Sequence, residues 1–236
     1  MALTPNTRTL QLARVRLLVQ EPTAQYWTDA LLNIYINEAQ MDIAVGCVPG
    51  APGSMEEPIL ASEAYTTSVA SQELYSLPPN YHGIRMVRAR SVSTEDYAEL
   101  PATDIEYARA HPRTSAAKPE AYFLWGESGT YQVGMYPAFN SANGTIYVAY
   151  WRLPDEMTQD SATLQIPAEL HVACTYLAAY KAWFERGYKS QAGDLMQMFT
   201  AEYQAKLPYI RRRQINAERA TMVGNIGDTD TERVLY

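Results

Sequence analysis

Histidine and cysteine side chains are the first candidates for chemistry, and the 236-residue chain has three histidines and two cysteines. His171 and Cys174 are three residues apart, so a helix would place them on one face. His82 and His111 lie in predicted loops. None of these side chains has a second ligand at the spacing of a zinc site. We therefore interpret His171 and Cys174 as packing residues and expect no metal ion and no cofactor.

Three other patterns each lack part of the site that they resemble. The Gly-Glu-Ser-Gly segment 126–129 lacks the Gly-x-Ser-x-Gly spacing of a nucleophile elbow. The acidic segment 228–232 lacks the central glycine and the final glutamate of a calcium-binding loop. The adjacent acids at 56–57 and 95–96 lie in predicted loops, where surface charge is a better interpretation than a glycosidase pair. The sequence shows no arrangement of catalytic residues that is typical of a hydrolase, and we expect a protein that is not an enzyme.

Charge and cysteine content narrow the function classes further. The net charge of −7 argues against wrapping nucleic acid, because phosphate binding needs clustered Lys and Arg. An acidic face would instead suit a channel wall along which DNA slides. Cys47 and Cys174 have no C-x-x-C partner, which predicts buried thiols in a protein made in a reducing cytoplasm. Residues 1–16 contain no apolar signal segment and no run of 18 apolar residues occurs, so we expect neither secretion nor a membrane.

The most informative element is a helix predicted over residues 28–45. Thr28 is a suitable N-cap, and Asp29 stands where the helix dipole favours an anion. An apolar stripe with helical spacing should face the core, and it consists of Leu32, Tyr35, Ile36, Ala39 and Ile43. A second stripe carries the uncharged amides Asn33, Asn37 and Gln40, where a surface facing only water would more often carry Lys and Glu. We predict that these amides face a neighbouring subunit or another partner.

Three more helices are predicted from apolar spacing. Residues 7–20 form the first, with Leu10, Ala13, Leu17 and Leu18 inward and Arg8, Arg14 and Arg16 toward solvent. Pro167 opens the third, which Gly187 ends, and its stripe is Leu170, Ala173, Leu177, Tyr180 and Phe184. The fourth covers 190–206, and we expect Pro208 to stop it. Its stripe is Ala192, Leu195, Met196, Phe199 and Tyr203.

Strand formers dominate the middle of the chain. Strands are predicted at 65–69, 84–92, 122–125, 131–136 and 145–151, with a short helix over 104–110. The predicted fold class is therefore α+β: a four-helix bundle from N- and C-terminal helix pairs, an inserted antiparallel β module and an extended C-terminal tail. The predicted boundaries are 1–60 for the first helix pair, 61–155 for the β module, 156–208 for the second pair and 209–236 for the arm.

Several segments resemble the head-to-tail adaptor (connector) proteins of tailed bacteriophages. The first is the helix just described, which reads Trp-Thr-Asp and then Tyr-Ile-Asn-Glu-Ala-Gln within 27–44. Further segments follow in the order of that family between residues 10 and 207: 73–81, the Pro-Glu-Ala-Tyr of 119–122, the Met-Tyr-Pro of 135–137, the strand 145–152 and the Ile-Pro of 166–167. Ala138 departs from the family, where a proline often follows Tyr-Pro.

This resemblance implies a structural protein of the virion neck, made in the cytoplasm of a bacterial host. It implies a ring, with twelve copies matching the portal, that lies beneath the portal protein and receives tail or nozzle proteins below. DNA would pass through the ring without sequence-specific binding. The alternative from another class is a tail-associated carbohydrate-binding or receptor module, because aromatic side chains are plentiful and sugars stack on them.

The interface residues are predicted from aromatic content and from the C-terminal segment. Eighteen tyrosines stand against four phenylalanines, and tyrosine suits interfaces that remain partly wet. Subunit or partner contacts are assigned to Tyr26, Trp27, Tyr147 and Trp151. In the C-terminal arm they are assigned to Arg211, Arg212 and Arg213 and to the apolar Val234, Leu235 and Tyr236.

Overall fold

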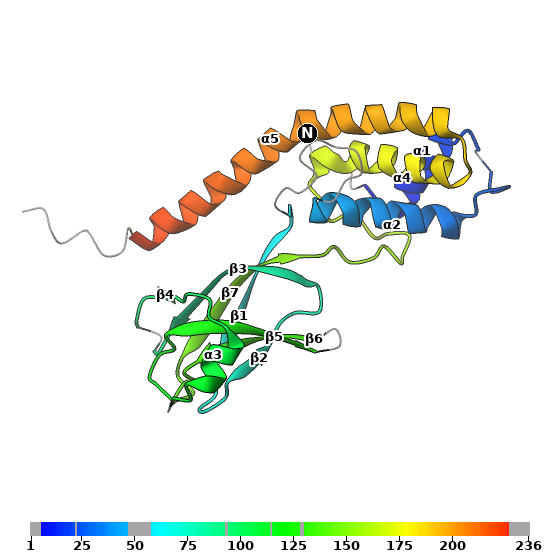
Figure 1. Ribbon diagram of the computed structural model, residues 1–236. Coiled ribbons are helices and arrows are strands. Elements are labelled where there is room, and N and C mark those ends of the chain that lie inside the picture. Colours follow the sequence, from blue (N-terminus) through cyan, green and yellow to red (C-terminus); the bar gives the residue numbers. More distant parts are fainter. Residues whose placement is uncertain are drawn as a thin grey trace, which may run out of the picture. The chain divides into compact units, whose positions relative to one another are not determined.

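The chain forms two compact units in the computed structural model, which describes residues 6–21, 23–46, 58–92, 94–113, 115–127 and 130–226, the last thirteen by backbone alone. The helical unit contains the described residues up to Ile43 and from Glu156 onward, and the β unit contains Ala44–Gly46 and the described residues before Glu156 (Figure 1). All the strands and one short helix (Ile105–Ala110) lie in the β unit, whereas the longer helices lie in the helical unit, which confirms the predicted α+β class.

The helical unit takes its elements from both ends of the chain. They are α1 (Arg8–Leu18), α2 (Asp29–Val45), the short 3₁₀ helix η1 (Ala168–Leu170), α4 (His171–Glu185) and α5 (Lys189–Ile226). Thr28 caps α2, because its hydroxyl accepts a hydrogen bond from the Leu31 N–H at 3.2 Å. Gly187 separates α4 from α5 with a φ of +83°, a conformation that favours glycine. The predicted cap and the predicted break are therefore confirmed.

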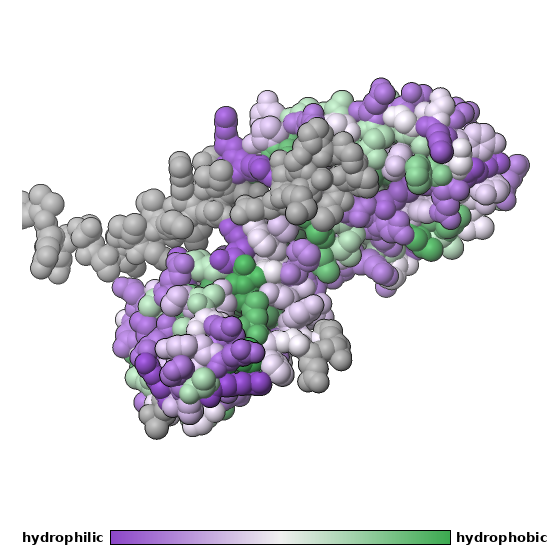
Figure 2. All heavy atoms as spheres, in the orientation of Figure 1, coloured by the Kyte–Doolittle hydropathy of each residue, from purple (hydrophilic) through white to green (hydrophobic). Residues whose placement is uncertain are grey.

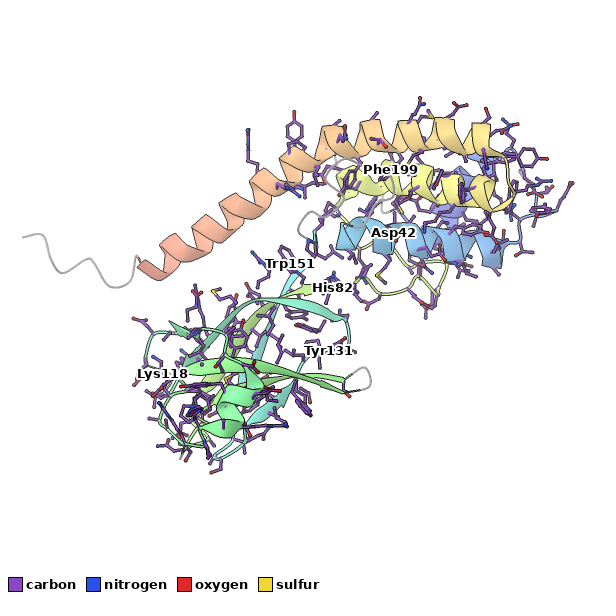
Figure 3. All side chains as sticks on the ribbon, viewed as in Figure 1. Asp42, His82, Lys118, Tyr131, Trp151 and Phe199 are labelled. Carbon is purple, nitrogen blue, oxygen red and sulfur yellow. The ribbon has the colours of Figure 1, made fainter. Side chains whose placement is uncertain are left out.

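Helix α4 lies between α2 and α5 (Figure 1). Small side chains cover much of its surface, and Ala173, Ala178, Ala179 and Ala182 are all fully buried. Phe199 of α5 is buried as well, and Lys181 of α4 pairs with Asp42 of α2 at 2.9 Å (Figure 3). Alanine leaves room for neighbouring helices to approach closely, so α4 serves as the centre of this unit.

The inward face of α1 differs from the prediction. Val15 is fully buried, whereas Leu17 is 73% exposed and Ala13 is exposed too. Arg16, predicted to face solvent, is buried, and its guanidinium pairs with Asp29 and donates to the Trp27 carbonyl at 3.0 Å. A buried charge needs such partners, and the apolar spacing in the sequence gives no sign of them.

Amide side chains of α1 and α2 accept hydrogen bonds from the returning segment of the chain and from α4. Asn37 and Gln40 of α2 each accept a hydrogen bond through the side-chain oxygen, from the N–H of Met157 at 3.0 Å and of Gln165 at 2.7 Å. Gln11 of α1 accepts from the Thr175 hydroxyl at 2.7 Å. Segment 157–165 forms an isolated antiparallel bridge with residues 6–8, and the amides of α2 accept hydrogen bonds from two further N–H groups of the segment.

Helix α5 continues beyond Pro208, so the prediction that this proline stops the helix is wrong. Its 38 residues span about 57 Å, against about 22 Å for α4. Leu207 and Ile210 on either side of the proline are both buried, and this packing offsets the missing N–H of Pro208. The predicted extended arm is therefore helical as far as Ile226, and residues 227–236 lie outside the described part.

The carboxylate of Glu21 organises the connection between α1 and α2. It accepts hydrogen bonds from the backbone N–H groups of Gln25 at 2.8 Å, of Trp27 at 3.0 Å and of Tyr26. Desolvation alone would raise the pKa of Glu21, but these donors and the Arg16 charge outweigh it and lower the pKa below its usual value. The ionised form of Glu21 therefore stabilises this loop.

The β unit contains two antiparallel sheets. The four-stranded sheet has the order β1-β7-β3-β4, with β1 at Ala61–Thr67, β7 at Thr145–Arg152, β3 at Tyr81–Arg90 and β4 at Ala98–Glu99. The three-stranded sheet has the order β2-β6-β5, with β2 at Leu74–Ser76, β6 at Thr130–Tyr136 and β5 at Ala121–Glu127. All five predicted strands are confirmed, and the sequence analysis missed only the short β2 and β4.

The core of the β unit forms from the inner faces of both sheets. Val87, Ile146 and Val148 come from the four-stranded sheet, and Val133 and Met135 come from the other. Helix α3 (Ile105–Ala110) begins at the predicted Asp104, whose side chain accepts from the Glu106 N–H at 2.9 Å. Its Ala108 packs with Phe123 and Tyr136 in a second, smaller cluster.

Replacing the buried Gln40 by methionine should destabilise the protein by about 1–3 kcal/mol, because the partly buried N–H of Gln165 loses an acceptor while side-chain volume is nearly kept. The matched control is Gln191→Met on the exposed face of α5, which should change the free energy of unfolding by less than about 0.5 kcal/mol. Urea denaturation followed by circular dichroism measures both, and equal midpoints would contradict this role for Gln40.

Acid should loosen the loop after α1. Because the pKa of Glu21 is lower in the folded protein, its contribution is complete above the unfolded pKa and disappears as the pH falls through the folded one. Amide exchange measured by NMR should therefore show protection of the Gln25 and Trp27 N–H groups at neutral pH that is lost in acid. In the variant Glu21→Gln this protection should be low at every pH, with α4 amides as the internal reference.

Candidate interaction surfaces

The exposed guanidinium group of Arg186 lies among aromatic rings at the junction between α4 and α5. The guanidinium carbon of Arg186 is 4.0 Å from the ring centre of Tyr26 and 5.3 Å from that of Tyr188. Tyr26 is 55% exposed, and Phe184 and Tyr188 are also exposed. We call this group of four residues, Tyr26, Phe184, Arg186 and Tyr188, the aromatic end. Tyrosine and arginine are frequent among residues that dominate protein–protein binding energy.

Trp27 lies beneath the aromatic end and belongs to the core of its own unit. It is 2% exposed, and its ring meets that of Trp183 edge to face at 5.0 Å. The predicted partner contact of Trp27 therefore needs correction, because its ring has no surface left for another subunit. Tyr26, its neighbour in the sequence, does offer its ring to solvent. The alternation of apolar and polar positions does not distinguish two adjacent aromatics in a loop. The prediction that Phe184 lies on the inward stripe of its helix is wrong, because Phe184 is 56% exposed. The sequence analysis missed Arg186 and Tyr188.

The three amides of α2 lie at the inner side of the helix rather than on an open surface. The oxygens of Asn37 and Gln40 are occupied by Met157 and Gln165, which accounts for both amides without a neighbouring subunit. Asn33 is also buried, but neither polar atom of its side chain has a hydrogen-bond partner among the described residues. On the open side of α2, Ile34 is 52% exposed, and hydrophobic residues appear over this helix in Figure 2.

The second aromatic surface is the outer face of the four-stranded sheet. Tyr147 and Trp151 of β7 point away from the core cluster, and both are half-buried. The ring of Tyr147 is 5.0 Å from that of Tyr65 on β1, and the guanidinium of Arg85 lies 4.5 Å over the ring of Trp151, labelled in Figure 3. Sequence analysis named the two β7 residues, and the structure adds their neighbours on β1 and β3.

Burial and a carboxylate perturb the hydroxyl of Tyr147. Desolvation raises the pKa of Tyr147 to about 12, and the hydrogen bond with Glu63 together with its negative charge acts in the same direction. The phenol therefore remains protonated and serves as a hydrogen-bond donor. This arrangement suits an interface rather than proton transfer near neutral pH.

The arginine cluster after Pro208 lies on helix α5. Arg211 is half-buried, whereas Arg212 and Arg213 are exposed, and Arg213 forms an ion pair with Glu169 at 2.9 Å. The structure thus gives Arg213 an ion pair within the chain. Val234, Leu235 and Tyr236 lie outside the described residues, so their assignment stays a prediction.

His171 and Cys174, the helical pair first considered for chemistry, are each buried or hydrogen-bonded. Burial raises the pKa of Cys174 to about 12, so its thiol is not a nucleophile at neutral pH. Burial lowers the pKa of His171, whose ring hydrogen-bonds to the Ile166 carbonyl at 3.0 Å. Within the described residues no group of three or more His, Cys, Asp or Glu side chains could hold a metal ion. Residues 47, 56–57 and 228–232 lie outside the described part.

No helix in the described part of the chain is long and apolar enough to cross a membrane.

Comparison with known proteins identifies the family of the chain. A search of curated proteins finds no match. The family model described as SU10 adaptor protein matches residues 7–226, a region that begins just before α1 and ends with α5. The match covers the helical elements and the whole of the β unit, and it agrees with the resemblance of the sequence motifs to phage head-to-tail adaptors. The chain therefore belongs to the SU10 adaptor protein family.

Proposed function

We propose that this protein is a structural head-to-tail adaptor of a tailed bacteriophage. Copies of the chain form a ring beneath the portal protein, join the DNA-filled head to tail or nozzle proteins, and let DNA pass without sequence-specific binding. The single observation that carries the proposal is the family match over residues 7–226. Adaptors of this family are structural proteins, and the proposal assigns the chain no enzymatic activity and no cofactor.

The proposal gives separate roles to the two units. The helices α1, α2, α4 and α5 act as a four-helix bundle that contacts portal and neighbouring copies. The β unit meets tail proteins, and residues 209–236 embrace a neighbour. Twelve copies match the symmetry that the resemblance implies for the portal, and the place of the ring is the virion neck after synthesis in the host cytoplasm.

A ring that closes by rotation needs two different faces on every copy. The aromatic end supplies one candidate, because Arg186 holds exposed tyrosine rings in a fixed arrangement. The outer sheet face around Tyr147 and Trp151 supplies another. The arginines 211–213 supply cations at the start of the embracing segment. The buried Asn33 supplies an amide whose polar atoms have no hydrogen-bond partner among the described residues.

The carbohydrate-binding alternative receives less support from the sheet face. A sugar platform needs an open aromatic ring, but Arg85 lies over the ring of Trp151, which is half-buried. Binding of the isolated protein to a glycan array would favour that alternative.

Native mass spectrometry tests the adaptor proposal directly. The protein alone is expected to be a monomer, and addition of portal protein is expected to give a closed ring with twelve copies of this chain per portal. The ring forms because the portal raises the local concentration of subunits at matched positions. A monomer that never joins the portal would overturn the proposal.

Replacing Arg186 by alanine should weaken ring formation about tenfold or more, because the exposed tyrosines lose the cation that orders them. The matched control is Lys189→Ala, which removes the same charge at an exposed neighbouring position. Thermal unfolding should be nearly unchanged in both variants. Titration with portal protein, followed by native mass spectrometry, measures the effect, and equal behaviour of the two variants would contradict a role for the aromatic end.

A further inference from the structure

Strand β1 presents the longest open edge among the described strands. It lies at one end of the four-stranded sheet and pairs with β7 over all seven residues without a register shift. At the opposite end, β4 is only two residues long, and β3 is interrupted by two register shifts. In the other sheet, β2 has three residues, and the edge of β5 is bonded to residues 101–103. Proteins usually shorten, bulge or cover such edges, and β1 is treated in none of these ways.

The register shows which backbone groups face the open edge. The N–H of Arg152 donates to the Leu60 carbonyl, and the N–H of Ser68 donates to the Gly144 carbonyl, both at 2.9 Å. Hydrogen-bonded pairs alternate along an antiparallel ladder, so the even-numbered residues of β1 direct their backbone toward β7. The odd-numbered residues therefore direct N–H and C=O groups outward, and these residues are Ala61, Glu63, Tyr65 and Thr67.

All four of these residues are exposed. Their N–H groups have no hydrogen-bond acceptor within the part of the chain that the structure describes. The edge spans about 24 Å and carries Glu63 as its single charged residue, with no proline. A row of outward N–H and C=O groups at this spacing is complementary to the backbone of another extended chain, and that is the chemistry of its ligand.

We propose that the open edge of β1 binds residues 229–235 of a second copy as an added antiparallel strand. This inference rests on the proposed ring, in which every copy contacts a neighbour. Ten residues follow the end of α5, and seven of them match the length of β1. Main-chain hydrogen bonds supply the affinity, and the side chains on alternate positions select the register.

The added strand can turn either its odd-numbered or its even-numbered side chains to the face of the sheet that carries Glu63. Charge favours the odd-numbered ones. With Arg233 opposite Glu63, opposite charges stand side by side on the outer face of the sheet. Shifting the strand by one residue would instead place Glu232, which Glu63 repels, or the uncharged Val234 opposite Glu63. The selected register also pairs Thr231 with Tyr65, Thr229 with Thr67 and Leu235 with Ala61. No ion pair joins Glu63 to another described residue. The hydroxyls of Tyr65, at 3.3 Å, and of Tyr147 both donate to its carboxylate.

A charge reversal in trans tests the pairing. The full-length variants Glu63→Arg and Arg233→Glu each bring like charges together, so each alone should lose the added strand. In an equimolar mixture the altered β1 of one variant meets the altered segment of the other, and both pairs again have opposite charges. Hydrogen exchange at residues 61, 63, 65 and 67, in the presence of portal protein, reports whether the strand is bound.

Exchange at these four amides should be slow in the wild type and at least about fivefold faster in each single variant. In the mixture it should become slow again. Equal exchange in wild type and single variants would overturn the proposal, as would faster exchange without recovery in the mixture. Loss of protection in Glu63→Arg but not in Arg233→Glu would assign the edge to a different strand, such as β1 of another copy, and would overturn it too.

A second pair of variants isolates the backbone contribution. Thr67→Pro removes an outward N–H without affecting the ladder with β7, whereas Thr67→Ala keeps the N–H. Only the proline variant should speed exchange at the other three amides. Native mass spectrometry of the same samples reports ring formation separately. Rings with unprotected β1 amides would overturn this pairing alone, and protected amides without rings would overturn the proposed function alone.

Discussion

The helical unit depends on hydrogen bonds between amide side chains of α2 and a segment that returns to it from the β unit. Asn37 and Gln40 hold the backbone at Met157 and Gln165, and Gln11 meets Thr175 of α4. Without these acceptors the returning segment would bury N–H groups at a cost of about 1–3 kcal/mol each. The segment leads directly into Pro167 and α4, so the position of the central helix depends on the same bonds.

Helix α4, which follows the returning segment, forms the core of the helical unit together with its neighbours. Its alanines allow α5 to approach closely, and larger side chains from the neighbouring helices, such as Phe199 and Ile36, fill the space around it. At the other end of the unit, Arg16 and Glu21 fix the loop that carries Trp27 to the ring of Trp183. The exposed aromatic end therefore stands on an ordered base, and an ordered surface loses less entropy when it binds a partner.

In the β unit, the two sheets share one core and leave different surfaces outside. The outer face around Tyr147 and Trp151 is already partly covered by tyrosine and arginine side chains. The edge of β1 is instead open along its backbone. A protein of the SU10 adaptor family must associate with other proteins to act, and these surfaces differ in how they would do so: side-chain contacts on one and main-chain hydrogen bonds on the other.

Local patterns in the sequence determined the helix α2 with its cap and apolar stripe, the break at Gly187, the five longer strands and the α+β class, because each depends on residues close together in the chain. Only the tertiary structure decided the burial of Arg16, the partners of Asn37 and Gln40 and the continuation of α5 past Pro208. A charged or amide side chain is buried when distant residues supply its hydrogen bonds, and a proline stays in a helix when packing on both sides offsets its lost bond. Neither condition can be read from the spacing of apolar residues, and the partners of Asn37 and Gln40 lie 120 and 125 residues away in the sequence.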